Sequence, residues 1–317
     1  MVGKLLTNDE MASSGESWSD DDVRTAVSSF LDDFSIEATP HASGEVDAYP
    51  EYLPTGTSVY IAHPPKSSLD DVVQLATRLC KLGYRPIPHL IARKFQSRQQ
   101  LDRTLGQLHD IGIDQALLIA GDLPRPLGPY HCVMNILETG LLPHHGFQNV
   151  GIAGHPEGSR VIGPTVLRRA LAEKANWGAE TGLTMYIVTQ FGFDAQAVID
   201  WEATVSAAGI GLPIHVGMAG KAPLKQLLRY AMRCGVTTSM RMLLGKASAM
   251  SENINLATAD ELVLAFARHR LAHTNCRMAR AHFFAFGGAE ATARWINAIR
   301  SGQFKIRRDR LVMEIMS

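Results

Sequence analysis

Residues 116–122 read ALLIAGD, an unbroken apolar run that ends in a glycine and then a single carboxylate, Asp122. A run without polar alternation is typical of a strand that is buried on both faces in a parallel sheet. Over so few residues, a buried helix segment would show the same pattern. The rest of the chain is therefore needed to tell whether this run is a strand or a helix, and what the Asp122 carboxylate faces.

Apolar runs of similar length recur along the whole chain. The eight candidate strands are FSIEA (34–38), SVYIA (58–62), RPIPHLI (85–91), QALLIA (115–120), NVGIAG (149–154), LTMYIVT (183–189), LPIHVG (212–217) and RAHFFAF (280–286). Stretches with the apolar period of a helix separate most of them, at 69–83, 97–112, 166–179, 195–209 and 222–235. This alternation predicts a parallel sheet, and eight repeats predict an α/β fold, the closed (β/α)8 TIM barrel. A doubly wound open sheet is the alternative, but the chain lacks the GxGxxG and GxxxxGK phosphate-binding patterns.

The segments before the second run depart from this alternation. Residues 1–20 are polar, and we predict a flexible N-terminus there, with Ser19 or Asp20 as the cap of a helix at 21–33. Between the first two runs, SGEVDAYPEYLPTGT (43–57) contains two prolines and little helical period. We therefore expect the first helix of the barrel to be abbreviated or absent.

The C-terminal part of the chain departs from it as well. The long segment 236–279 contains MRMLLGKASAM and ATADELVLAFARHRLAHT, which suggest extra helices instead of one crossover. After Gly302, the sequence QFKIRRDRLVMEIMS alternates like a strand and is too distal to belong to the barrel. We predict a single barrel domain at 21–300, including the N-terminal helix, and a C-terminal tail at 301–317.

Composition narrows the kind of partner. Hydrophobic residues make up 46% of the 317 residues and charged residues 20%, which is ordinary for a globular protein. Lys+Arg and Asp+Glu both total 31, so net charge indicates neither nucleic acid nor an anionic membrane as a partner. No apolar stretch approaches the roughly 20 residues that span a bilayer. We expect a soluble protein with a small ligand.

The four cysteines favour a reducing compartment. Cys80, Cys132, Cys234 and Cys276 are widely separated, without CxxC or metal-ligand spacing, and the N-terminus does not resemble a signal peptide. We therefore expect the protein to be cytoplasmic.

Polar residues mark the ends of nearly all candidate strands. In a barrel of this kind the active site lies at the C-terminal ends of the strands. The residues near or just past those ends are Glu37, His63, His89, Asp122, His155 with Glu157, Gln190, His215 and His282. Each alone is more simply explained as a helix cap or a partner of loop amides, but the set together indicates a site.

Three of these residues suggest particular chemistry. Glu37 lies among apolar residues, where burial favours the protonated form that can donate a proton; the alternative is a salt bridge to a neighbouring strand. Gln190, framed by Phe191 and Phe193, suits a planar heterocycle with an amide edge, or else only bonds its loop. Asp122 precedes LPRPLG and has the alternative role of ordering a proline-rich turn.

A metal site is not predicted. His89, His155, His215 and His282 are the histidines that a barrel site would use, but no HxH or HExxH spacing supports one.

The order of these pieces resembles the methylenetetrahydrofolate reductase family, from about residue 34 to 300. The matching pieces are FSIEATP with Glu37, PHL (88–90), GD (121–122), HPEG (155–158), Lys174 before WGAE, TQFGFD (189–194), VGMAG (216–220) and HFFAF (282–286). The family has a (β/α)8 barrel that binds FAD, takes a hydride from NADH or NADPH and reduces 5,10-methylenetetrahydrofolate to 5-methyltetrahydrofolate.

The resemblance implies roles for individual residues. Glu37 would be the general acid that protonates N10 as the imidazolidine ring opens, and Asp122 would lie beside the pterin and flavin rings as a second catalytic residue. Gln190 would hold the pterin. The other implied substrate-binding residues are Phe191, Phe193, Leu224 and His282, and the implied cofactor-binding residues are His89, Gly121, Asp122, His155, Glu157 and Lys174.

The chain departs from the family where FAD is held. Family members with tightly bound FAD read LRGD and YPExH where this chain reads IAGD and HPEGS, and the phenylalanine after strand 7 is Leu224. The family's polar contacts to the FAD phosphates and adenosine fall on residues without the same donors, and the departing positions are Ala120, Ser159, Leu167, Ala170 and Glu173. Loss of charge-assisted hydrogen bonds to a pyrophosphate predicts weak or absent FAD binding, with the pocket partly given over to NAD(P)H. The alternative is that Tyr130, His155 and Arg168 replace the missing contacts.

Three functions are compatible with these residues. The first is NAD(P)H-dependent methylenetetrahydrofolate reduction in one-carbon metabolism, in either direction and linked by the family to methionine biosynthesis. The second is folate-dependent methyl transfer on the same barrel without a hydride. The third is a binding protein that has lost the reaction, against which the retained Glu37, Asp122 and Gln190 argue. We expect a small-molecule folate partner and a homo-oligomer.

Overall fold

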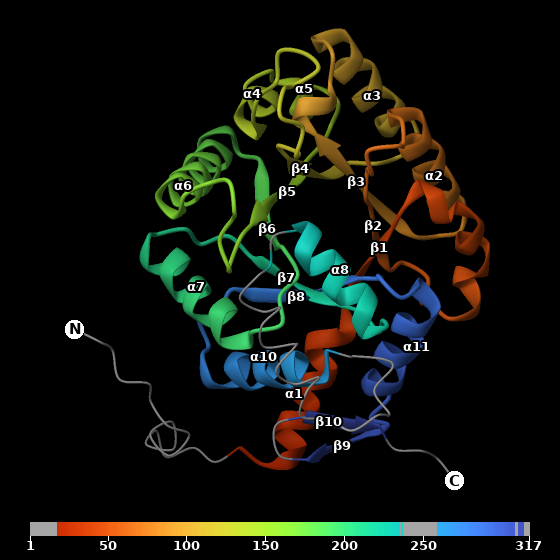
Figure 1. Ribbon diagram of the computed structural model, residues 1–317, viewed down its shortest axis with the longest axis vertical. Coiled ribbons are helices and arrows are strands. Elements are labelled where there is room, and N and C mark those ends of the chain that lie inside the picture. Colours follow the sequence, from red (N-terminus) through yellow and green to blue (C-terminus); the bar gives the residue numbers. More distant parts are fainter. Residues whose placement is uncertain (1–17, 235, 237–258, 308–309, 314–317) are drawn as a thin grey trace.

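Eight parallel strands close into a barrel, each hydrogen-bonded to the next in the sequence and β8 to β1 (Figure 1). The structure, a computed structural model, describes residues 18–234, 236, 259–307 and 310–313. The barrel strands are β1 (Ser35–Ala38), β2 (Ser58–Ile61), β3 (Arg85–Ile91), β4 (Gln115–Ile119), β5 (Asn149–Gly154), β6 (Thr184–Thr189), β7 (Ile214–Ala219) and β8 (Met278–Phe284). All eight overlap the predicted runs, so the (β/α)8 barrel is confirmed and the open sheet is wrong.

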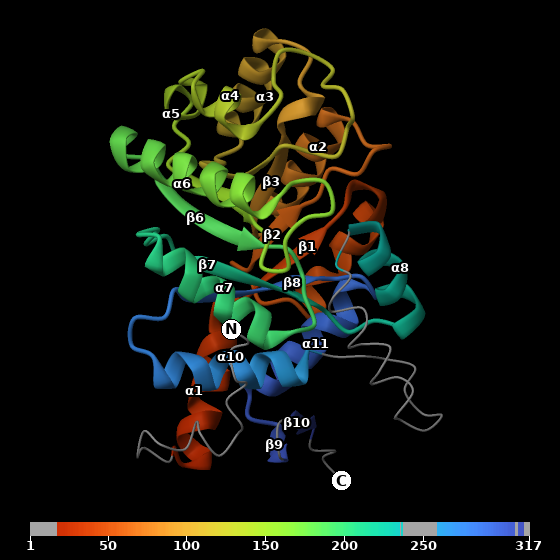
Figure 2. The ribbon, with the colours of Figure 1, turned by 60° about the vertical axis from the view of Figure 1, so that its left-hand side comes forward.

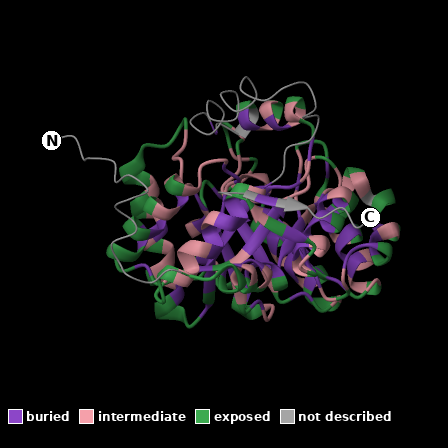
Figure 3. Cartoon of the chain, turned by 90° about the horizontal axis from the view of Figure 1, so that it is seen from below, coloured by how far each residue is buried: buried purple, intermediate pink, exposed green. Residues whose placement is uncertain are grey.

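Residues 116–119 are all apolar because β4 is buried on both faces. Leu117 and Ile119 belong to a cluster inside the barrel, whereas Ala116 and Leu118 pack in the layer between strands and helices. Figure 3 shows buried residues concentrated in the central strands and exposed residues on the outer elements.

The helices form where the apolar period predicted them. The predicted ones are α1 (Asp20–Asp32), α2 (Leu69–Lys81), α3 (Arg98–Asp110), α6 (Pro164–Thr181), α7 (Ala195–Ala207) and α8 (Leu224–Cys234). Side-chain caps fix several starts, since Ser19, Ser68 and Ser97 each accept a hydrogen bond from a backbone N–H of the first turn. Figure 2 shows α6, α7 and α10 (Asp260–Ala272) around the outside of the strands.

Several connections differ from a regular crossover. The first barrel helix is replaced by the 3-10 segment η2 (Pro40–Glu51), as the prolines there predict. A further short turn, η3 (Ala92–Lys94), follows β3. Two short helices, α4 (Val133–Leu137) and α5 (Leu141–His144), stand between β4 and β5 and were not predicted.

The C-terminal part adds helices and a hairpin. Of the two predicted extra helices, α10 is present, while MRMLLGKASAM lies outside the described residues. The helix α11 (Ala289–Arg300) follows β8 and was not predicted. The tail forms an antiparallel pair, β9 (Phe304–Arg307) and β10 (Arg310–Met313), instead of one strand, and it lies outside the barrel as expected.

The helix α1 packs under the barrel against α10 and α11 (Figure 1). Phe30 of α1 makes an edge contact with Phe266 of α10, with ring centroids 6.2 Å apart. Arg24 of α1 lies over the ring of Phe304, which attaches the C-terminal hairpin. None of the described helices is long and apolar enough to cross a membrane.

Candidate active site

Three strands bring Glu37 together with two histidines inside the barrel. Glu37 Oε1 lies 3.5 Å from His89 Nε2 and 3.8 Å from His282 Nε2. Neither contact is a hydrogen bond, and both imidazole nitrogens are buried without a hydrogen-bond partner among the described residues. The Glu37 side chain is 14% exposed. Polar side-chain atoms from β1, β3 and β8 therefore meet at one place inside the barrel, which is partly open to solvent.

A salt bridge between Glu37 and His89 is not favoured by the electrostatics. Burial lowers the pKa of His89, although the Glu37 carboxylate opposes that shift. A neutral His89 ring gives the carboxylate no positive charge to pair with.

A polar layer lies next to this cluster in the barrel. Ser35 Oγ is 3.0 Å from His282 Nδ1, and the Tyr60 hydroxyl is 3.0 Å from His215 Nδ1. The Tyr60 ring packs on that of His282, with centroids 4.5 Å apart. The Ser35 hydrogen bond and the Tyr60 ring fix the orientation of His282 and hence the side that its Nε2 presents to Glu37. Sequence reasoning missed Ser35 and Tyr60. Ser35 lies two residues before Glu37 on the same face of β1, and Tyr60 is on the interior face of β2.

The placement of His215 at a C-terminal strand end was wrong. The strand β7 is Ile214–Ala219, so it begins and ends two residues later than predicted. His215 is therefore at the beginning of β7, where it stacks on Tyr186 with ring centroids 4.3 Å apart. Burial, with a smaller effect of Arg280, lowers the pKa of His215 to about 2, so it is a neutral interior side chain.

Gln190 follows β6 directly and lies at the C-terminal end of the barrel. Its backbone N–H donates to the Gly154 carbonyl, and a recess beside it is lined by Pro156, Glu157, Phe191 and Val198. Phe191 itself is 2% exposed and packs against Phe193. Gln190 and Glu157 thus share one recess, and Phe191 supports its wall.

An aromatic cluster closes the same side of the mouth. The ring centroid of Phe191 is 5.4 Å from that of Phe284 and 4.8 Å from that of Phe286. Leu224, the first residue of α8, packs against this cluster. Of the predicted substrate-binding residues, Gln190, Phe191 and Phe193 follow β6 and Leu224 follows β7, whereas His282 lies within β8.

Gly121 and Asp122 follow β4 at the rim. Gly121 has φ +89°, and a Cβ there would be 2.3 Å from Ile91 Cγ2 at the end of β3. Asp122 is exposed. Arg93 holds this loop, because its guanidinium donates to the carbonyls of Leu123 and His131. Arg93, which sequence reasoning missed, accounts for the ordering of the proline-rich turn.

His155 and Lys174 lie close together beyond β5. Burial lowers the pKa of both, and the Lys174 charge lowers the pKa of His155 further. His155 follows β5 and Lys174 lies on α6. Lys174 is a half-buried cation in this part of the site, and Arg93 and Lys94 are half-buried cations beside the end of β3.

The positions that depart from the family have other uses. Ser159 Oγ accepts hydrogen bonds from the N–H groups of Val161 and Ile162. Glu173 Oε1 is 3.5 Å from Arg169 Nε. Leu167 and Ala170 are half-buried on α6, and Ala120 is half-buried beyond β4. None of the five therefore offers a cation to an anionic ligand.

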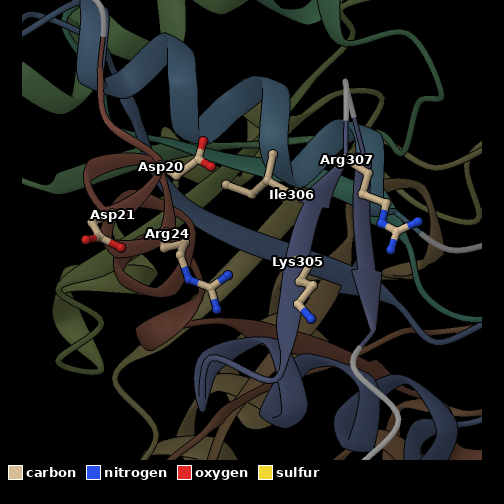
Figure 4. A pocket seen from close by; sticks show the side chains of 6 residues that line it. All are labelled: Asp20, Asp21, Arg24, Lys305, Ile306 and Arg307. Carbon is tan, nitrogen blue, oxygen red and sulfur yellow. The ribbon is translucent and has the colours of Figure 1, made fainter.

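A groove elsewhere on the chain shares no element with this site. It lies between the first turn of α1 and β9 and is lined by Asp20, Asp21, Arg24, Lys305, Ile306 and Arg307 (Figure 4). Its charges are of both signs, and it presents no imidazole or carboxyl from a barrel strand.

The fold and the site define a (β/α)8-barrel protein with a carboxyl and two imidazoles clustered inside the barrel and aromatic side chains around its mouth. A family model described as methylenetetrahydrofolate reductase matches residues 64–299, and the chain belongs to this family. Membership of this family supports a folate-related activity for the chain, and proteins of the family are in general flavin-related. Glu37 precedes the matched segment, so its role does not follow from the match.

Two solved structures are similar to this chain. An uncharacterized protein from Clostridium thermocellum, described as binding two copies of 5-methyl-5,6,7,8-tetrahydrofolic acid, is 13% identical with a TM-score of 0.57, over 86% of this chain and 96% of that chain. Dihydropteroate synthase (FolP) from Thermus thermophilus is 12% identical with a TM-score of 0.44, over 86% and 94% of the two chains. At these identities the first similarity shows a shared fold, and the second carries no further weight.

Proposed function

We propose that this protein catalyses the NAD(P)H-dependent reduction of 5,10-methylenetetrahydrofolate to 5-methyltetrahydrofolate. The observation that carries the proposal is the convergence of Glu37, His89 and His282 inside the barrel, in a chain of the methylenetetrahydrofolate reductase family. The similar protein from Clostridium thermocellum binds 5-methyltetrahydrofolate, which is the product of this reaction.

Glu37 is proposed as the proton donor. When the bond between the methylene carbon and N10 breaks, the nitrogen becomes a basic amine and takes a proton, while the carbon takes a hydride from NAD(P)H. Glu37 is the carboxyl at the cluster, and the buried nitrogens of His89 and His282 limit where a substrate nitrogen can lie beside it. The proton therefore passes from Glu37 to N10 over one hydrogen bond.

Gln190 and the aromatic cluster are proposed to hold the pterin. A side-chain amide both donates and accepts hydrogen bonds, as the pyrimidine edge of a pterin requires. Phe191 follows Gln190 directly, and Phe193 and Phe284 extend the apolar wall beside it. Asp122, exposed at the rim on the loop held by Arg93, is proposed to lie beside the reacting rings.

The described residues fit FAD incompletely. A pyrophosphate needs cations or free N–H donors, and Lys174 is the half-buried cation near the end of β5. Ser159 accepts from two backbone N–H groups and has only its neutral O–H to offer a phosphate, and Glu173 adds a negative charge beside Arg169. No step is therefore assigned to a flavin, and we propose that FAD binds weakly or not at all and that NAD(P)H reacts at the folate site directly.

The test is an assay of the purified full chain with 5,10-methylenetetrahydrofolate and either NADH or NADPH, without added flavin and then with FAD. We expect 5-methyltetrahydrofolate to form with no flavin, and a flavin titration to show weak binding or none. Two lost charge-assisted hydrogen bonds, at roughly 1.5–3 kcal/mol each, would weaken FAD by two or more orders of magnitude.

Three other results of this assay would each favour a different cofactor use or function. Protein that purifies yellow with stoichiometric FAD, or that needs FAD for any turnover, would show that Tyr130, His155 or Arg168 had replaced the missing contacts. Methyl transfer from 5-methyltetrahydrofolate to an acceptor, without nicotinamide oxidation or reduction, would favour a methyl-transfer protein. Folate binding with neither activity would indicate a binding protein.

A further inference from the structure

Three side chains with metal-ligand chemistry meet between α7, α10 and the turn before β8, outside the barrel. They are Glu202 of α7, His269 of α10 and Cys276. Their ligand atoms all lie within 4.8 Å of one another, and among the described residues this is the group that could hold a metal ion. We propose that Glu202, His269 and Cys276 form a binding site for a divalent transition-metal ion, best matched by Zn²⁺, with water as the fourth ligand.

The two closest ligand atoms are spaced as around a zinc ion. His269 Nε2 lies 3.6 Å from Glu202 Oε2. Zinc bonds of roughly 2.0–2.3 Å in a tetrahedral arrangement place neighbouring ligand atoms about 3.3–3.8 Å apart. The observed separation is too long for a hydrogen bond and fits two ligands of one ion.

The imidazole nitrogen is unsatisfied without such an ion. His269 Nε2 is buried and has no hydrogen-bond partner among the described residues, although a buried polar nitrogen ordinarily has one.

The carboxylate of Glu202 is oriented by its other oxygen. Oε1 accepts hydrogen bonds from the backbone N–H of Arg277 and from the Ser206 hydroxyl, each at 3.2 Å. This leaves Oε2 directed toward His269. Supporting contacts of this kind hold the first ligands of a metal in place.

The turn that carries Cys276 is also fixed. Its backbone N–H donates to the His273 carbonyl at 3.0 Å, and the His273 ring stacks on His269 with centroids 4.3 Å apart. Cys276 is a half-buried free thiol. Thiolate, imidazole and carboxylate together are a ligand set that zinc accepts. An ion there would join α7 and α10 to the start of β8, and the site is independent of the folate reaction.

The experiment uses the full chain purified without a metal-chelating tag and stripped with a chelator. We expect about one equivalent of Zn²⁺ to bind and raise the melting temperature, and Co²⁺ to give the near-ultraviolet absorption of a thiolate ligand. Cys276→Ser should abolish that absorption, and Glu202→Gln, which keeps the acceptor for Arg277, should weaken Zn²⁺ binding at least about tenfold.

Cys80→Ser is the matched control, because Cys80 is also a free, half-buried cysteine packed on the main core. It should bind Zn²⁺ and Co²⁺ like the unchanged protein. The proposal is overturned if Co²⁺ binds without thiolate absorption, if no equivalent of Zn²⁺ binds, or if Cys276→Ser binds as tightly as the unchanged chain.

A second measurement does not depend on any variant folding. Zn²⁺ should slow alkylation of Cys276 in the unchanged protein, as measured by peptide mass spectrometry, while exposed Cys132 reacts at the same rate as before. Equal alkylation rates at Cys276 with and without Zn²⁺ would also refute the site.

Discussion

At the scale of single residues, the feature that matters is a carboxyl held close to two buried imidazoles. Glu37 lies within 4 Å of two imidazole nitrogens, and burial lowers the pKa of His89. The Ser35 hydroxyl contacts the other nitrogen of the His282 ring and fixes its orientation. The proposed general acid therefore has a fixed surrounding in which a bound molecule can be positioned.

Replacing Glu37 by glutamine tests this role. Glu37→Gln keeps the shape of the side chain and removes the acid, so we expect kcat to fall by about 10²–10⁴-fold while folate still binds. The measurement is kcat and KM with 5,10-methylenetetrahydrofolate, beside a direct folate titration. The control is Glu45→Gln, which changes an exposed acid on η2 and should leave both constants unchanged. Near-normal turnover of the Glu37 variant would move the role to Asp122.

At the scale of elements, the sequence predicted every barrel strand because each is a short apolar run between turn residues. It failed for short segments and near the end of the chain. The helices α4 and α5 are too short to show a helical period, α11 was missed, and β7 begins and ends two residues later than its predicted run. The candidate site was predicted in part. Residues at strand ends were predicted, but Ser35, Tyr60 and Arg93 act through partners far apart in the sequence, which no local pattern reveals.

The connection after β4 offers a test of how tightly the rim is built. Gly121 and Gly112 both have positive φ, at +89° and +83°, but only at Gly121 does an added Cβ meet another side chain, Ile91. We expect Gly112→Ala to cost about 1–2 kcal/mol of unfolding free energy, from backbone strain alone. Gly121→Ala should cost about 1–3 kcal/mol more, because it also overpacks the end of β3. Urea unfolding measures both.

The difference between the unfolding free energies of the two variants measures the cost of overpacking the contact between Gly121 and Ile91, where β3 and β4 approach closely at the rim. Since Asp122 follows Gly121, the Gly121 variant should also lose activity when it is still folded. Equal unfolding free energies for the two variants would show that Ile91 moves aside, and that the rim is softer than its geometry indicates.

At the scale of the whole molecule, buried histidines make the folding stability of the barrel dependent on pH. Burial, aided by the charge of Lys94, lowers the pKa of His63 from 6.5 to about 4, and the pKa of His215 is about 2. Both stay neutral in the folded protein at pH values where the unfolded chain takes up protons. Because the unfolded state then binds more protons, stability is fully present above about pH 6.5 and is lost as pH falls below it.

His63→Gln tests this linkage at one position. His63 Nε2 donates to the Ser67 carbonyl at 2.9 Å, and a glutamine amide can make the same bond without titrating. For the unchanged protein we expect each such histidine to add a slope of up to about 1.4 kcal/mol per pH unit between pH 6.5 and the folded pKa. Urea unfolding from pH 7.5 to 4.5 should show that slope reduced by about this amount in His63→Gln. The exposed His41→Gln serves as the control and should keep the original slope. An undiminished slope in the His63 variant would mean that His63 takes up its proton in the folded protein as readily as in the unfolded chain, and the acid sensitivity would then belong to the interior histidines of the barrel.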